Sequence, residues 1–158
     1  MMYLNTDEVA MLVPVLVAAI FGGLIGIERE TRHKPAGVGT NVLICAGACM
    51  FTLLSIRMDP SSPSRIASNI LTGVGFIGAG LILKEVDGSI HGLTTAAGIW
   101  MAAAVGMGVG FHYYLLATIG TLLAVFAPRL PDWSGRWNKM TGKPAEVQAA
   151  KPGTTITK

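Results

Sequence analysis

Between Val9 and Pro128 the chain alternates long apolar stretches with short charged segments. Each stretch has about the length that a helix needs to cross a ~30 Å hydrocarbon layer, because each helical residue adds ~1.5 Å. Hydrophobic residues make up 51% of the chain and charged residues only 13%, a composition unlike that of a soluble domain. We therefore predict an all-α integral membrane protein.

The apolar pattern predicts about five transmembrane helices packed through glycine and small-residue faces. The uncharged run 93–127 is too long for one crossing, so we place a turn at the glycine-rich segment 106–110. A single tilted helix followed by an amphipathic surface helix is the alternative. The predicted helices lie at about 9–27, 38–56, 66–83, 93–108 and 113–127, within a transmembrane domain of residues 1–128. Residues 129–158 are predicted to form a basic cytoplasmic tail that is partly disordered.

The positions of Lys and Arg predict the orientation, because positive residues are retained on the cytoplasmic side during insertion. They are concentrated in the connection after the first helix and in the early tail, whereas the second connection carries only Arg57 and Arg65. This bias places the N-terminus outside and the C-terminus inside. The net charge of +3 is then a topology signal, and no basic, aromatic-interleaved patch favours nucleic-acid binding.

Glycines recur at helical spacing in the first and third apolar segments, where they let neighbouring backbones approach closely. The alternative is that they let a helix unwind and expose carbonyls to an ion or solute near mid-membrane. We predict helix packing at six glycines: Gly22, Gly26, Gly73, Gly75, Gly78 and Gly80.

Polar and small residues also share one face of the third apolar segment. At helical spacing, Asn69, Thr72, Gly73, Phe76 and Gly80 point the same way. We expect this face to look inward, with Asn69 and Thr72 as interhelical hydrogen-bond partners.

Charged residues gather at the helix ends, and Glu28, Arg29 and Glu30 follow the first helix directly. If that helix continues, Glu30 lies on the same face as Gly22 and Gly26, so we expect its carboxylate to face neighbouring helices. Carboxylates in such positions are costly and often functional. The alternative is a solvated cluster that anchors topology and pairs through Arg29.

We predict that the chain is not an enzyme, because no nucleophile and base stand at a recognisable spacing. Cys45 and Cys49 lie four residues apart on one helix, a spacing unfavourable for a disulfide and insufficient for a zinc site. No cofactor is expected beyond a linkage to Mg²⁺. The weak candidates for metal ligands are the carboxylates Glu28, Glu30, Glu85 and Asp87.

Several motifs together resemble the MgtC/SapB family of bacterial inner-membrane proteins. They are GGLIGIERE at 22–30, KPAG at 34–37, TN at 40–41, SRIA at 64–67, TGVGFIGAG at 72–80 and GLTTAA at 92–97 with Trp100. The resemblance covers roughly residues 11–126. With the polar positions described above, it gives seven candidate functional residues: Glu28, Arg29, Glu30, Thr40, Asn69, Thr72 and Thr95.

The resemblance implies a role in bacterial adaptation to low magnesium and, in pathogens, survival inside phagocytes. It also implies the inner membrane as location and a membrane-protein partner such as the F-type ATP synthase. Virulence members of the family add a cytoplasmic C-terminal domain, and this chain resembles a short form without it.

Three functions are consistent with these features. The first is a non-enzymatic regulator that binds a membrane partner, which we favour. The second is a small transporter or channel that works as an oligomer. Its path would be lined by Glu28, Glu30, Asn69, Thr72 and Thr95. The third is a magnesium or pH sensor built on the carboxylates at the inner side.

Overall fold

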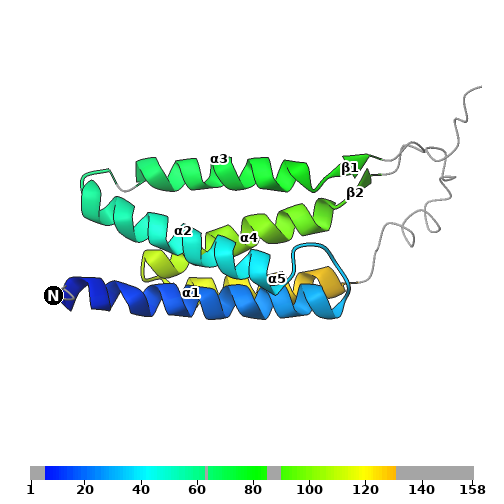
Figure 1. Cartoon of the computed structure of the whole chain (residues 1–158), viewed down its shortest axis with the longest axis horizontal. Helices are drawn as coiled ribbons and strands as arrows, with labels where there is room; N and C mark the ends of the chain where they lie inside the picture. The colour runs from blue at the N-terminus through cyan, green and yellow to red at the C-terminus, as the bar shows by residue number, and fades with distance from the viewer. Residues whose placement is uncertain (1–5, 63, 85–89, 131–158) are drawn as a thin grey trace, which may run out of the picture.

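In the structure, a computed structural model, the described residues form an elongated bundle of five helices (Figure 1). It describes residues 6–62, 64–84 and 90–130. Between α3 and α4, two short antiparallel strands of two residues each pair with one another, with Leu83 opposite His91. The elements are α1 Thr6–Thr31, α2 Val38–Met58, α3 Ser64–Gly80, β1 Leu83–Lys84, β2 Ile90–His91, α4 Leu93–Gly110, α5 Tyr114–Phe126 and the 3₁₀ turn η1 Ala127–Arg129.

The predicted all-α membrane fold is confirmed. Within the part of the chain that the structure describes, three segments are long and apolar enough to cross a bilayer: Val9–Thr31, Val38–Met58 and Leu93–Gly110. The apolar segment Tyr114–Arg129 is shorter, and α3 has 17 residues. At ~1.5 Å per residue, the length of α3 is slightly less than the thickness of a ~30 Å hydrocarbon layer.

The turn predicted at residues 106–110 is wrong. Helix α4 continues through Gly110, and the reversal occurs at Phe111 and His112, the latter with a φ of 64°. All three glycines of this segment, Gly106, Gly108 and Gly110, lie against other helices instead of forming a turn. The sequence signal was ambiguous because glycine serves both a tight reversal and a close helix contact.

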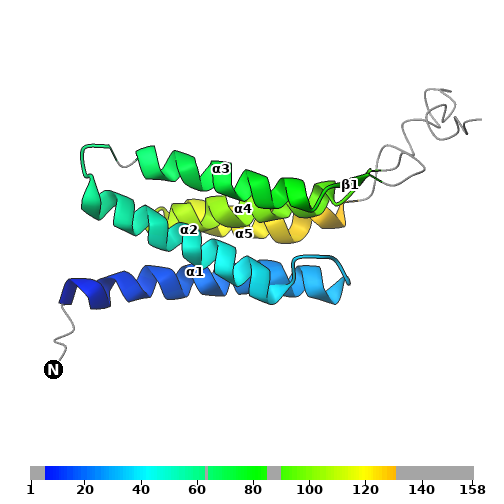
Figure 2. The same cartoon turned by 45° about the horizontal axis from the view of Figure 1, so that its top comes forward.

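Helix α2 lies at the centre of the bundle, crossing α1 on one side and α4 on the other (Figures 1 and 2). The apolar core between these helices contains many small side chains, among them Ala18, Cys45, Cys49 and Ala102, all fully buried, together with larger ones such as Ile25. Large apolar side chains such as Leu16 and Leu115 instead point outward and are more than half exposed. Large apolar side chains on the outside and small ones inside are the arrangement expected of a protein whose outer surface contacts lipid.

Close approach of α2 to its neighbours depends on glycines. A Cβ on Gly22 or Gly26 of α1 would overlap the backbone of α2 at Asn41 or Val38. On the other side of α2, a Cβ on Gly106 would overlap the Cys45 carbonyl. The predicted packing role of Gly22 and Gly26 is therefore seen directly in the contacts.

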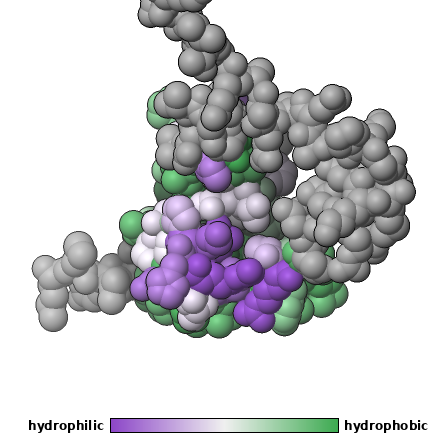
Figure 3. All heavy atoms as spheres, turned by 90° about the vertical axis from the view of Figure 1, so that its right-hand side faces the viewer, coloured by the Kyte–Doolittle hydropathy of each residue, from purple (hydrophilic) through white to green (hydrophobic). Residues whose placement is uncertain are grey.

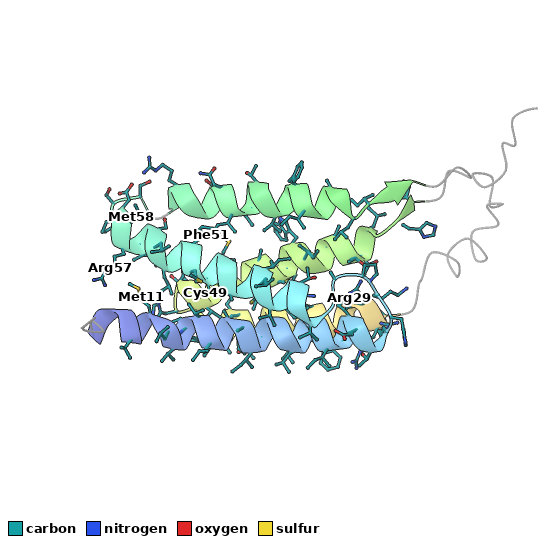
Figure 4. All side chains as sticks on the ribbon, viewed as in Figure 1. Met11, Arg29, Cys49, Phe51, Arg57 and Met58 are labelled. Carbon is teal, nitrogen blue, oxygen red and sulfur yellow. The ribbon has the colours of Figure 1, made fainter. Side chains whose placement is uncertain are left out.

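The two ends of the bundle carry different connections. The α1–α2 loop, the β hairpin and η1 lie at one end, and the α2–α3 and α4–α5 connections lie at the other (Figure 1). In Figure 4, Arg29 is at the first end, whereas Arg57 and Met58 are at the opposite one. We call the end with the α1–α2 loop and η1 the basic end, because it holds Arg29, Arg32, Lys34 and Arg129.

Candidate functional site

A buried polar cluster occupies the basic end, where α1 meets α4 and η1. Glu28 and Arg29, in the last turns of α1, are only 3% and 4% exposed. The Arg29 guanidinium donates a hydrogen bond of 2.5 Å to the hydroxyl of Thr95, which is itself buried in the first turn of α4. This contact joins two positions that are 66 residues apart in sequence.

The Glu28 carboxylate lies under two further arginines. Its Oε1 is 3.4 Å from Arg32 Nη1 and 3.9 Å from Arg129 Nε. The same Arg32 nitrogen donates a hydrogen bond of 2.8 Å to the carbonyl of Pro128 in η1. Oε2 of Glu28 is buried and has no hydrogen-bond partner among the described residues. The cluster therefore joins the end of α1 to the end of α5 and has more positive than negative charge.

Glu30 does not have the position expected for it. Its side chain is exposed, and Oε2 accepts a hydrogen bond of 3.1 Å from the backbone N–H of Val38, the first residue of α2. Glu30 therefore contacts the neighbouring helix α2, but it is not shielded from solvent as expected, and Glu28 is the buried carboxylate. Glu30 instead satisfies a free N–H at the start of a helix, where negative charge is favourable.

Asn41 was missed as a site residue by the sequence analysis, although it is 1% exposed. Its amide nitrogen donates hydrogen bonds to the carbonyls of Ala36 and Gly37, at 2.6 and 3.0 Å. These bonds hold the α1–α2 loop, in which Ala36 has a φ of 60°. An asparagine four residues after a Pro-Ala-Gly turn is a usable signal, because Asn near a helix start often bonds to the preceding loop. Its neighbour Thr40 is exposed.

Helix α3 turns its polar face away from the bundle, so the expectation that this face looks inward is wrong. Only Val74 and Gly78 of its described side chains are buried, whereas Asn69 and Thr72 are exposed and Phe76 is 83% exposed. The apolar positions Ile70 and Val74 contact the core instead. Helical periodicity identified the shared face correctly but could not determine its direction, because in lipid both faces of a helix can be apolar.

The glycines of α3 also divide between the face that contacts the bundle and the face that is exposed. A Cβ on Gly78 would meet Ala96 of α4 at 3.6 Å, an ordinary contact. Gly73, Gly75 and Gly80 have nothing within 4 Å among the described residues. For these three, helix packing stays a prediction about contacts with another molecule.

An apolar groove of about 540 Å³ separates α2 from α3. Phe51, labelled in Figure 4, lies on the α2 side of it. Asn69 is the polar side chain at this groove, and its amide has no hydrogen-bond partner in the described part of the chain. The lining residues are Leu43, Ile44, Gly47, Ala48, Phe51, Asn69, Ile70, Gly73, Val74 and Ile77.

The candidate residues do not form one site. Glu28, Arg29 and Thr95 lie together at the basic end, whereas Asn69 and Thr72 lie on the outer face of α3. The described residues contain no group of three or more His, Cys, Asp or Glu that could hold a metal ion. Glu85 and Asp87 lie outside the described residues. Beside Glu28, the guanidinium groups already supply the positive charge that a cation would bring.

The sequence matches the profile of the MgtC family over residues 15–135. It is 35% identical over 143 residues to an uncharacterized protein of Haemophilus influenzae, covering 84% of this chain and 60% of that protein. It is 41% identical to protein MgtC of Salmonella typhimurium, over 72% of this chain and 48% of the relative. For protein MgtC of Brucella abortus the identity is 43%, over 68% and 45%.

The chain thus spans about half the length of the curated relatives that it matches. No solved structure matches it. The family match covers most of the five-helix bundle, including the buried cluster at the basic end and the whole of α3. This multi-pass membrane protein belongs to the MgtC family.

Proposed function

We propose that this chain is a non-enzymatic regulator that acts by binding another membrane protein along the outer face of α3. The observation that carries the proposal is the amide of Asn69, which has no partner among the described residues and lies beside the open backbone of Gly73 on the exposed face of α3. In water an exposed asparagine needs no explanation. In hydrocarbon, an amide without a hydrogen bond is costly, so a partner that supplies one is favoured.

The composition of this face suits a transmembrane helix as partner. Gly73 and Gly80 let a second backbone approach, and Asn69 supplies a hydrogen bond across the contact. Phe76, 83% exposed, adds a large side chain that a partner helix would cover. Asn69 lies about 7 Å along the helix from its first residue, so the contact begins just inside the membrane.

By family resemblance, the setting is adaptation of a bacterium to low magnesium at its inner membrane. From the distribution of Lys and Arg we infer that the N-terminus lies outside and the C-terminus inside. The F-type ATP synthase is the partner that the resemblance suggests, and a second copy of the chain is the alternative. We infer this role from the family. The exposed groups on α3 support binding of a membrane partner but do not identify it.

The transporter alternative receives less support from the geometry. Of its five expected lining residues, only Asn69 borders the groove between α2 and α3, and the groove is otherwise apolar. Glu28 and Thr95 lie at the basic end and belong to a separate, closely packed cluster. The described residues therefore do not form a continuous polar path through one copy of the chain.

Site-specific photo-crosslinking in bacterial membranes tests the proposal. A photoreactive residue at Asn69 or Phe76 is expected to give a crosslink to one discrete membrane protein. The same residue at Leu115 of α5, which is 76% exposed, serves as the matched control and should give none. Equal crosslinking from all three positions would contradict a specific α3 surface, and a product of two copies of this chain would show self-association instead.

A second experiment uses a variant whose fold the structure predicts to be intact. Gly73→Leu adds a side chain where nothing lies within 4 Å, so the bundle should form while the partner contact is blocked. Co-purification of the crosslinked partner should fall at least about tenfold, the loss expected for about 1.4 kcal/mol of binding free energy. Ion or solute flux in liposomes that disappears in Asn69→Ala would overturn the regulator in favour of a transporter.

A further inference from the structure

We propose that Arg32 and Arg129 form a binding site for the phosphate of an anionic phospholipid at the basic end. The two side chains come from opposite parts of the sequence, one from the loop after α1 and the other from η1. Both place a nitrogen within 4 Å of the same atom, Oε1 of Glu28. Their guanidinium groups are therefore held next to each other before any ligand arrives.

Placing several arginine side chains close together costs electrostatic free energy, and the single carboxylate of Glu28 does not neutralise them. The side chain of Glu28 is 2% exposed and carries one negative charge, while Arg29, Arg32 and Arg129 carry three positive charges around it. Glu30, a second carboxylate at this end within the described part of the chain, accepts a hydrogen bond from the backbone N–H of Val38. The positive excess is thus directed outward, toward whatever approaches this end.

Among the described residues, contacts occupy only some of the donors of the two guanidinium groups. Arg32 uses Nη1 for both Glu28 and Pro128, and Arg129 makes the 3.9 Å ion pair together with a ring contact. Their side chains are 41% and 53% exposed. Each guanidinium can still offer a two-pronged pair of N–H donors, the geometry that matches the oxygens of a phosphate.

The surroundings favour a lipid phosphate over one in free solution. The Arg129 guanidinium lies 5.4 Å from the centre of the Phe126 ring, and Phe126 and Leu123 on the same face of α5 are about half exposed. Basic groups thus lie directly above an apolar helix surface, the order in which a phospholipid presents its phosphate and its acyl chains. Figure 3 looks onto this end and shows hydrophilic residues gathered in one patch bordered by hydrophobic ones.

The test compares the thermal stability of purified protein in detergent with added phosphatidylglycerol or phosphatidylcholine. We expect phosphatidylglycerol to raise the melting temperature more, and to be retained preferentially in native mass spectra. The double variant R32Q/R129Q should bind phosphatidylglycerol roughly tenfold or more weakly, because each Arg near an anionic lipid contributes to binding. The control K34Q/R65Q removes the same charge from exposed positions outside the pair and should keep the effect.

Three outcomes would overturn the proposal. In the first, R32Q/R129Q keeps the full difference between the two lipids. In the second, inorganic phosphate at equal concentration stabilises the protein as much as phosphatidylglycerol, which would identify a site for free phosphate. In the third, neither lipid has an effect and the arginine pair instead retains an acidic protein.

If R32Q/R129Q fails to fold, R32K/R129K replaces it. Lysine keeps both charges but cannot present the two-pronged donor, so the preference for phosphatidylglycerol should be reduced yet still detectable. Undiminished preference in R32K/R129K would show that charge alone attracts the lipid and that no phosphate site exists.

Discussion

Glycines serve opposite purposes in the two halves of this bundle. Where α2 crosses α1 and α4, Gly22, Gly26 and Gly106 lie so close to a neighbouring backbone that no Cβ would fit. On the outer face of α3, Gly73 and Gly80 have open space. The contrast shows that a glycine-rich helix is not by itself evidence of internal packing, since the same residue can equally leave a surface open for another molecule.

The largest expected effect comes from making the same substitution, glycine to alanine, at one position of each kind. Gly106→Ala places a Cβ against the Cys45 carbonyl, so we expect a loss of about 2 kcal/mol or more in the free energy of unfolding. Gly73→Ala meets nothing and should stabilise α3 by up to about 1 kcal/mol, because alanine is the better helix former. Unfolding in mixed detergent measures both. Equal effects of the two variants would remove the distinction.

The buried cluster provides a second comparison, between two threonines. Thr95→Val removes the acceptor of the buried Arg29 guanidinium, so a loss of about 1–3 kcal/mol is expected. Thr72→Val on the outer face of α3 breaks only a long bond to its own helix at Ser68 and should leave the melting temperature almost unchanged. If Thr95→Val also leaves the melting temperature almost unchanged, Arg29 finds another acceptor and the account of the buried cluster is contradicted.

A third comparison concerns the loop that joins α1 to α2. Asn41→Ala removes the amide that donates to Ala36 and Gly37, and we expect a loss of about 1–2 kcal/mol together with faster hydrogen exchange in the loop. Thr40→Ala, at the exposed neighbouring position, is the control and should change neither. Unchanged exchange in the Asn41 variant would show that the loop keeps its shape without these bonds.

The smallest effect is expected at the opposite end of the bundle, in the α2–α3 connection. A hydrogen bond from Ser61 and the nearby Arg65 guanidinium hold the pKa of Asp59 below its usual value of 3.8. Its stabilising contribution is present above that value and lost as the pH falls through the lower, folded-state pKa. Asp59→Asn should therefore lower the melting temperature slightly at neutral pH and not at all in strong acid. A difference that persists in acid would contradict this account.

Much of the fold follows from the sequence because hydropathy and helix length are local properties. The apolar stretch after Gly37 becomes α2, and the one after Gly92 becomes α4. The position of the last turn did not follow, since Gly106 and Gly110 contact α2 and leave the reversal to Phe111 and His112. A contact with a distant helix is not visible in the local pattern.

The candidate site was predictable only in part, for the same reason. Helical spacing correctly grouped Asn69 with Thr72 but gave no direction for their face. It also pointed to Glu30 where Glu28 is the buried carboxylate, because the loop after α1 turns back and uses Glu30 at the start of α2. Arg32 and Arg129 lie beside Glu28 only because the fold brings residues near the start and the end of the helical bundle together, and no sequence motif indicates this contact.

The central place of α2 has a consequence for how the protein is made. Cys45 meets Gly22 of α1 through its side chain and Gly106 of α4 through its carbonyl. During synthesis α1 and α2 leave the ribosome first, joined by a short loop, and can pair as soon as both are in the bilayer. The other side of α2 then faces lipid until α4 has been translated, so the order of translation is also the order of assembly.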